Sequence, residues 1–347
     1  MKKHRWKLSF FLAIISCCVL PALPVAYDPV IYPFWINLIS PRNVHFSNPR
    51  LIAEGLDAYK ITWSGDGSRI EVYEIMSTLT TPHTPDLVKV FDAHTGVLVD
   101  MYEKDDPPNR ELSVCPDKNI AVEFKYIEER KLSLSFIRDD QQAYEFVFSP
   151  VQRGEYEDSR GPYGASFSPR CNYLTFMVNG WIGREADGRN ELWLLDVHDA
   201  ILRPIVIGRW PVFKLWDYPV QSVQPDWSPD EDEIVFGDSE FGFEIYNIET
   251  KKRRWLAGPG TLGLEPIWSH DNKWIAAEQP RTDQNSNYDS ILVISLDGNK
   301  KAETGQCLFF NDIEWSLVNN VLAYLCSSSQ GNNSLWVWEL DGTLRSK

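Results

Sequence analysis

One short tag, Trp227-Ser228-Pro229-Asp230, recurs in six related copies along the chain of 347 residues. The other copies begin, in chain order, at Trp63, Val114, Phe167, Trp268 and Trp315. Successive copies are separated by 41 to 60 residues. A repeat of this length on strand-like segments is typical of a β-propeller, in which each repeat forms one blade. The tags therefore predict an all-β fold, a six-bladed β-propeller of four-stranded antiparallel blades.

The residues around the clearest tag have the pattern of a complete blade. Residues 223–227 predict an inner strand that ends at the tag, and the Pro and Asp of the tag favour a tight turn. Residues 233–236 are rich in β-branched and aromatic residues, which favours a second strand. Residues 243–248 alternate as a third strand, and the polar residues 252–256 suit an outer edge strand.

The last repeat lacks the length for an outer strand, because only five residues follow Gly342. Residues 48–55, ahead of the first tag, resemble the predicted fourth strand at residues 253–258. We therefore predict that this N-terminal strand completes the sixth blade and closes the ring. Closure of this kind removes two open sheet edges, which would otherwise favour aggregation. Residues 48–347 are thus expected to form a single propeller domain.

The tags with their downstream strands, as in Trp227-Ser228-Pro229-Asp230 followed by residues 234–236, resemble the TolB-type, WD-repeat-like six-bladed β-propeller family. The resemblance covers roughly residues 55–342 and concerns the repeat, not a site. Most copies depart from the usual Trp-Ser-Pro-Asp-Gly of that family. The resemblance implies an exported or periplasmic propeller of a kind that mostly binds proteins.

The first 26 residues have the composition of a leader or a membrane anchor. Four cationic residues among the first seven precede a mainly apolar run over residues 8–26. The stretch ending at Cys17 resembles a bacterial lipobox, which predicts lipidation of Cys17. Cleavage after Ala26 and retention as an uncleaved anchor stay open, since the run is just long enough to span a bilayer. Each route predicts an exported protein, and lipidation or retention also predicts membrane association. We therefore expect an exported, membrane-associated protein of the bacterial cell envelope, with residues 27–47 as a linker.

The net charge of the chain excludes one class of partner. The formal net charge is −15 at pH 7. A surface this acidic repels phosphate backbones, so we expect no nucleic-acid partner. The hydrophobic content of 43% is sufficient for one packed domain. We expect a monomer whose membrane contact is made through the leader or a lipid.

Four cysteines follow the leader, namely Cys115, Cys171, Cys307 and Cys326. They contain no C-x-x-C pair, and the histidines show no paired ligand spacing, so we expect no metal site. An exported chain can form disulfides, and a bridge between Cys307 and Cys326 stays open. We expect the cysteines to be small buried thiols.

The sequence gives little support for a catalytic function. The chain contains no G-x-S-x-G, H-E-x-x-H or G-x-x-x-x-G-K motif. A G-x-G-x-x-G stretch occurs at residues 258–263, but Pro266 and a tag follow it where a dinucleotide site needs a helix. Carboxylates in the turns, such as Asp66, Asp230 and Asp232, could hold calcium, yet Asp in turns more often caps its own backbone. We therefore predict no cofactor and no catalytic residue.

Strand parity places the long insertions on one face of the predicted ring. Loops between second and third strands, and crossings between blades, lie on the face opposite the tag turns, and these are the long connections. They are rich in aromatic residues and arginine, the composition enriched at protein interfaces. The predicted binding residues are Trp181, Arg184, Trp210, Trp216, Tyr218, Arg281 and Tyr288.

The sequence leaves two hypotheses for the function. The first is a non-catalytic exported propeller that binds a protein or peptide through its long-loop face. The alternative is an envelope hydrolase or lyase that acts on glycans, with carboxylates at the central channel. Aromatic residues of the insertions that fold back over the ring would weaken the first reading.

Overall fold

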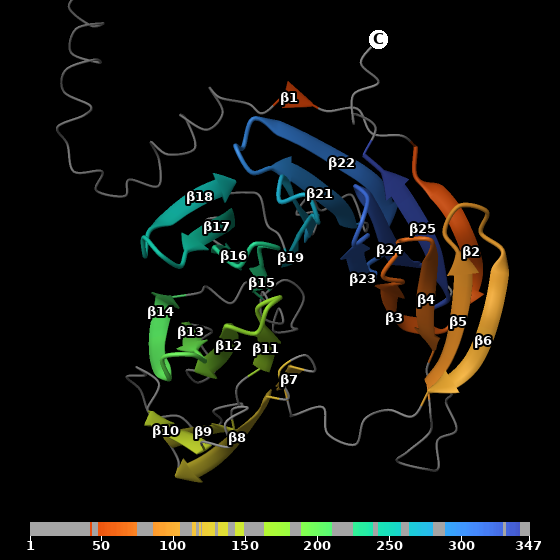
Figure 1. Ribbon diagram of the computed structural model, residues 1–347. Helices are drawn as coiled ribbons and strands as arrows, with labels where there is room; N and C mark the ends of the chain where they lie inside the picture. Colours follow the sequence, from red (N-terminus) through yellow and green to blue (C-terminus); the bar gives the residue numbers. More distant parts are fainter. Residues whose placement is uncertain are drawn as a thin grey trace, which may run out of the picture. The chain divides into compact units, whose positions relative to one another are not determined.

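The computed structural model describes residues 42–43, 48–74, 86–104, 113–115, 118, 120–128, 131–137, 143–148, 163–180, 189–209, 225–238, 242–257, 264–279, 289–328 and 331–340. The chain divides into two compact units, residues 1–40 and residues 41–347. All described residues belong to the second unit, and they form strands and turns (Figure 1).

Blades 1 to 3 follow the strand order that the tags predict. Blade 1 consists of β3 (Ala58–Trp63), β4 (Arg69–Glu74), β5 (Asp86–Asp92) and β6 (Leu98–Lys104). Blade 2 consists of β7 (Ser113–Cys115), β8 (Ile120–Glu128), β9 (Lys131–Ile137) and β10 (Ala143–Phe148). Blade 3 consists of β11 (Tyr163–Phe167), β12 (Tyr173–Gly180), β13 (Arg189–Asp196) and β14 (Ile201–Arg209).

Blades 4 to 6 repeat this order. Blade 4 consists of β15 (Asp226–Trp227), β16 (Glu233–Asp238), β17 (Gly242–Asn247) and β18 (Arg253–Ala257). Blade 5 consists of β19 (Leu264–Trp268), β20 (Trp274–Gln279), β21 (Asp289–Ser295) and β22 (Lys300–Cys307). Blade 6 consists of β23 (Phe310–Trp315), β24 (Val321–Ser327), β25 (Asn333–Glu339) and the N-terminal β2 (Arg50–Leu56).

The predicted N-terminal closure is confirmed. Strand β2 pairs antiparallel with β25, with Leu51 opposite Trp336 and Ala53 opposite Leu335. Because β2 runs directly into blade 1, this pairing joins the two ends of the repeat. A further short strand, β1 (Arg42–Asn43), pairs in parallel with β22 and lies within the span predicted as a linker.

The tag serine closes the turn between the first and second strands. In blade 4 the Ser228 N–H donates to the Glu233 carbonyl oxygen at 2.9 Å, and the Glu233 N–H donates back to Ser228 Oγ at 2.9 Å. The same pair of bonds forms at Ser64, Ser168 and Ser269. Three residues beyond each of these serines the backbone has a positive φ, at Gly67, Cys171, Glu231 and Asn272. Of these four residues only Gly67 is a glycine, which adopts a positive φ without steric cost.

In four of the six blades the tag tryptophan joins the blade to the one before it. The indole N–H of Trp227 donates to the carbonyl oxygen of Ser166, the residue directly before the tag of blade 3, at 3.2 Å. The same rule holds in three other blades, where the acceptors are the carbonyl oxygens of Glu314 (for Trp63), Asp226 (for Trp268) and Ile267 (for Trp315). The repeat is therefore a device for joining neighbouring inner strands.

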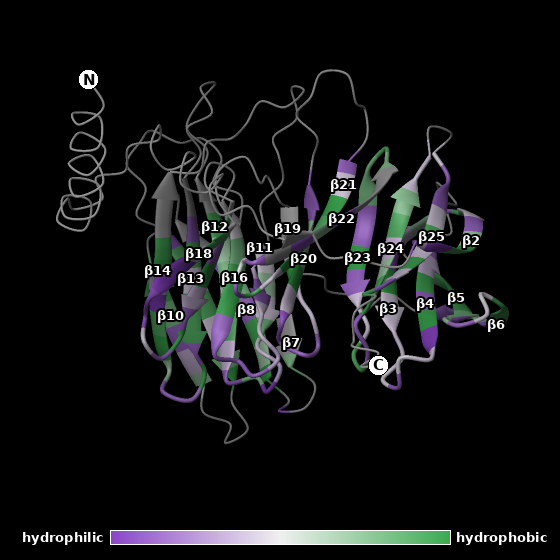
Figure 2. Cartoon of the chain, turned by 90° about the horizontal axis from the view of Figure 1, so that it is seen from above, coloured by the Kyte–Doolittle hydropathy of each residue, from purple (hydrophilic) through white to green (hydrophobic). Residues whose placement is uncertain are grey.

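The apolar core consists of layers between blades. Five clusters of buried side chains each contain residues of two consecutive blades, and they join blade 2 to 3, 3 to 4, 4 to 5, 5 to 6 and 6 to 1. The strands carry the hydrophobic residues, while the turns between them are mainly hydrophilic (Figure 2). Burial of these layers is the main stabilising contribution to the fold.

The expectation of free buried thiols was wrong. Cys115 is bonded to Cys171, and Cys307 is bonded to Cys326, with Cα–Cα distances of 6.2 and 5.3 Å. The first bridge joins the tag turns of blades 2 and 3, where Cys115 takes the serine position and Cys171 takes the position with positive φ. The second bridge joins Cys307, the last residue of β22 in blade 5, to Cys326 on β24 in blade 6, which pairs with Phe310 on β23.

Candidate functional site

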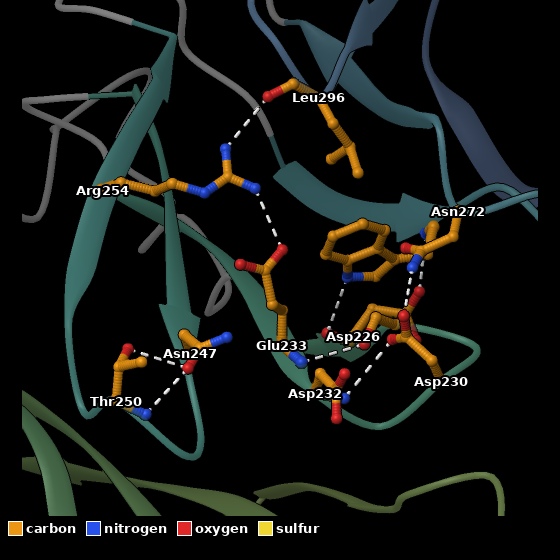
Figure 3. Close-up of polar contacts among 11 residues, drawn as sticks. Asp226, Asp230, Asp232, Glu233, Asn247, Thr250, Arg254, Asn272 and Leu296 are labelled. Atoms are coloured by element: carbon orange, nitrogen blue, oxygen red, sulfur yellow. Dashed lines mark hydrogen bonds and ion pairs between the residues drawn. The ribbon is translucent and has the colours of Figure 1, made fainter.

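The tag turns are tied to one another around one face. Asn272 Nδ2 donates to Asp230 Oδ2 at 2.6 Å, which joins blade 5 to blade 4 (Figure 3). Analogous bonds between neighbouring turns run from Asn172 to Glu231 (2.7 Å), from Asn320 to Asp271 (3.0 Å) and from Lys118 to Asn172 (2.8 Å). The polar groups of these turns are thus largely used within the fold.

A second tie between blades 4 and 5 is made by Arg254 on β18, the outer strand of blade 4. The guanidinium of Arg254 donates to Glu233 in its own blade and to the carbonyl oxygen of Leu296 in the next, both at 3.0 Å (Figure 3). In the turn that precedes β18, the Thr250 N–H and hydroxyl donate to Asn247 Oδ1. These bonds also use side chains for structure.

The long connections leave the blades at the opposite face, because they join second to third strands or one blade to the next. The seven predicted binding residues all fall in such connections. Trp181 and Arg184 follow β12, Trp210, Trp216 and Tyr218 follow β14, and Arg281 and Tyr288 follow β20. All seven, and Cys17 as well, lie outside the described residues.

Three carboxylates on the inner strands were missed by the sequence analysis. Asp226 lies on β15, and Asp312 and Glu314 lie two residues apart on β23. Asp226 Oδ2 accepts the backbone N–H of Trp268 at 2.7 Å, and Asp312 Oδ2 accepts that of Ile61 at 2.7 Å. Two of these carboxylates therefore join inner strands of neighbouring blades. An acid directly before the tag tryptophan, as at Asp226 and Glu314, was the available signal.

Glu314 differs from the other two in its environment. Its Oε2 atom is buried and accepts no hydrogen bond among the described residues. Burial, together with the charge of Asp312, raises its pKa from 4.5 to about 8, and Lys60 opposes the shift. Burial likewise raises the pKa of Asp226 from 3.8 to about 6, against the backbone N–H groups that it accepts. A carboxyl group with a pKa near neutrality can donate or accept a proton at physiological pH.

Two of the turn carboxylates that could have held calcium, Asp66 and Asp230, accept hydrogen bonds from nearby groups. Asp66 Oδ1 accepts the hydroxyl groups of Ser64 and Ser68 and the Ser68 N–H at 2.7 to 3.0 Å. These hydrogen bonds lower its pKa to about 2. Across the described ranges no group of three or more His, Cys, Asp or Glu residues is arranged to hold a metal ion.

Six four-stranded antiparallel blades that follow one another along the chain, the last completed by an N-terminal strand, define a six-bladed β-propeller. The two disulfides indicate an extracytoplasmic protein, because such bonds persist in oxidising compartments. The described segments include no apolar helix of the length that a membrane crossing requires.

No protein-family model matches the chain, and no curated protein matches it in sequence. Among solved structures it is similar to TolB from Acinetobacter baumannii, with 12% identity and a TM-score of 0.47 over 80% of this chain and 65% of that one. It is also similar to an oligogalacturonate lyase in complex with manganese, with 10% identity and a TM-score of 0.47 over 86% and 82% of the two chains.

Proposed function

We propose that the protein is an exported, non-catalytic propeller that binds a protein or peptide partner through the face of its long connections. The observation that carries the proposal is a difference between the two faces of the propeller: one holds short turns that are bonded to one another, and the other holds the long connections. Bonds such as Asn272 to Asp230 and Asn320 to Asp271 occupy the tag turns on one face. The long connections, with their aromatic residues and arginines, leave from the other face, and long loops on a rigid scaffold are where binding usually resides.

Within this proposal the seven residues predicted from the sequence form the contact surface. Trp and Tyr contribute large apolar area with a polar tip, and Arg contributes hydrogen bonds in a fixed geometry, which is why these types dominate interface hot spots. The residues are Trp181, Arg184, Trp210, Trp216, Tyr218, Arg281 and Tyr288.

We further propose that the leader at residues 1–26 delivers the protein to the envelope and associates it with the membrane. The cationic start and the apolar run support this role, and lipidation of Cys17 would provide the anchor. The two disulfides agree with folding outside the cytosol. Globomycin treatment, which blocks processing of lipidated leaders, should retain the precursor; a Cys17→Ala variant that is processed normally would contradict lipidation.

The experiment for the binding proposal is a quantitative pull-down from solubilised envelope. We expect the Trp181→Ala and Trp216→Ala variants to recover at least tenfold less partner than wild type, since hot-spot tryptophans carry about 2 kcal/mol or more. Leu317→Ala is the matched control, because Leu317 is an exposed apolar residue of a tag turn on the other face. Equal recovery with all three variants would contradict the proposed face.

A second candidate function rests on Glu314. A buried carboxyl group with an unpartnered oxygen and a pKa of about 8 is protonated at neutral pH, as a general acid must be. With Asp226 as a second carboxylate, this supports the alternative of a hydrolase or lyase that acts on glycans. Release of new reducing ends from envelope and plant-type polysaccharides is the assay. Activity that Glu314→Gln abolishes and the exposed control Glu249→Gln retains would favour this function; no activity on any polysaccharide would exclude it.

A further inference from the structure

The seam between blades 1 and 2 differs from the other five in its packing. Each of the other seams has a cluster of buried apolar side chains from both blades. In the described part of the chain, the remaining cluster consists of Tyr73, Val88 and Val90 with Tyr59, and all four belong to blade 1. No described apolar cluster therefore joins blade 1 to blade 2.

The tag of blade 2 also lacks the group that ties a blade to its predecessor. Val114 occupies the tryptophan position, so no indole N–H is present to reach the carbonyl oxygen of Thr62, which directly precedes the tag of blade 1. Blade 3 has Phe167 at this position, but there the Cys115–Cys171 disulfide and the bond from Lys118 to Asn172 join it to blade 2.

The face of blade 1 that is turned away from blade 6 carries polar groups beside its own apolar cluster of Tyr73, Val88 and Val90. Ile61 and Val72 pack against blade 6, while the alternate residues on β3 and β4 lie on the opposite face. There Lys104 Nζ donates to Tyr73 Oη at 3.0 Å, and Tyr73 donates to Glu71 at 2.9 Å. These polar groups are satisfied within blade 1 and do not need blade 2.

The corresponding face of blade 2 is exposed. Ile120 and Val122 on β8 pack against blade 3, and the alternate residues on the same strand, such as Glu123, are exposed. On the neighbouring strands Ile137 and Val147 are 58% and 57% exposed. The other seams have a buried apolar layer that two blades share. At this seam the described apolar residues are instead buried within blade 1 or exposed on blade 2.

We propose that the ring has a built-in joint at this seam, and that blade 2 moves with blade 3 and away from blade 1. The disulfide between Cys115 and Cys171 holds blade 2 to blade 3. Among the described residues no apolar layer is shared with blade 1, and Val114 supplies no indole to bond to it. The free energy of local opening depends on such contacts, so it is lowest where they are fewest. The proposal of a joint does not depend on which partner the face of the long connections binds.

Distance distributions between paired spin labels test the joint. Labels at Met101→Cys on β6 and Val147→Cys on β10 report on blades 1 and 2, and both positions are more than half exposed. Labels at Ile201→Cys and Lys252→Cys, also exposed, report in the same way on blades 3 and 4. The full chain carries serine at positions 17 and 18, so that the four remaining native cysteines stay paired.

The proposal expects a distribution for blades 1 and 2 that is at least twofold wider than the one for blades 3 and 4. In a Val114→Trp variant the added indole can donate to the Thr62 carbonyl oxygen, by the rule that four other tags follow. This variant should narrow the first distribution toward the second. Equal widths in the wild-type background would overturn the proposal, and that comparison stands even if Val114→Trp fails to fold.

Discussion

Replacing Glu314 with glutamine should stabilise the propeller at alkaline pH and leave its stability unchanged at acid pH. The pKa of Glu314 is raised in the folded state from 4.5 to about 8, chiefly by burial. Between these values the unfolded chain has released the proton and the folded chain still holds it. The stability is thus fully present below pH 4.5 and is lost as the pH rises through 8.

The size of the effect follows from the width of that interval. Each unit of pKa difference corresponds to about 1.36 kcal/mol, so the full interval gives roughly 5 kcal/mol. Side-chain reorientation toward water on ionisation reduces this, and we expect about 2 to 5 kcal/mol at pH 9. Glutamine mimics the shape and neutrality of the protonated acid, so Glu314→Gln should escape the loss.

The assay is urea unfolding of wild type and Glu314→Gln at pH 4, 6.5 and 9, followed by tryptophan fluorescence. The free-energy difference between the two proteins should be near zero at pH 4 and should grow toward pH 9. Glu249→Gln, at an exposed turn residue, is the control and should give a flat difference. A constant difference across the range for Glu314→Gln, or lower stability of that variant at pH 9, would refute the reasoning.

Two further predictions concern ties between blades. Trp268→Phe removes the indole donor to the Asp226 carbonyl oxygen and should lower the free energy of unfolding by about 2 kcal/mol, measured by urea unfolding at pH 7; an unchanged midpoint would argue against the tie. Glu231→Ala removes the acceptors for the Arg170 N–H and Asn172 and keeps a residue with positive φ, whereas Glu231→Gly relieves that conformation. Both should be less stable than wild type, with glycine about 1 kcal/mol above alanine; the reverse order would contradict the backbone argument.

Much of the fold could be predicted from the tags, because one tag position has one physical role in each blade. The periodic Trp-Ser pair located the inner strands, and the shortage of residues after Gly342 led to the pairing of β2 with β25. The strand alternation in residues 243–248 matches β17, one residue offset. These are local patterns, and strong local patterns survive in the folded chain.

The remaining features depend on neighbours across the ring, which a linear pattern does not contain. Cys115 and Cys171 are 56 residues apart and stand in the serine and glycine positions of two different tags, so neither resembles half of a bridge. The raised pKa of Glu314 depends on its burial and on groups of other blades, such as Lys60 and Asp226, so the sequence analysis did not single it out. The predicted contact residues, such as Trp181 and Trp216, lie outside the described residues and stay a prediction.

The indole bonds have a consequence for how such a chain can change over evolutionary time. Each tryptophan donates to a main-chain oxygen, which every amino acid supplies, so the partner blade needs no particular side chain there. A blade can therefore diverge, or be exchanged for another, without a matching substitution next door. That freedom explains why the position directly before the tag can hold residues as different as Ser166, Ile267 and Glu314 in one architecture.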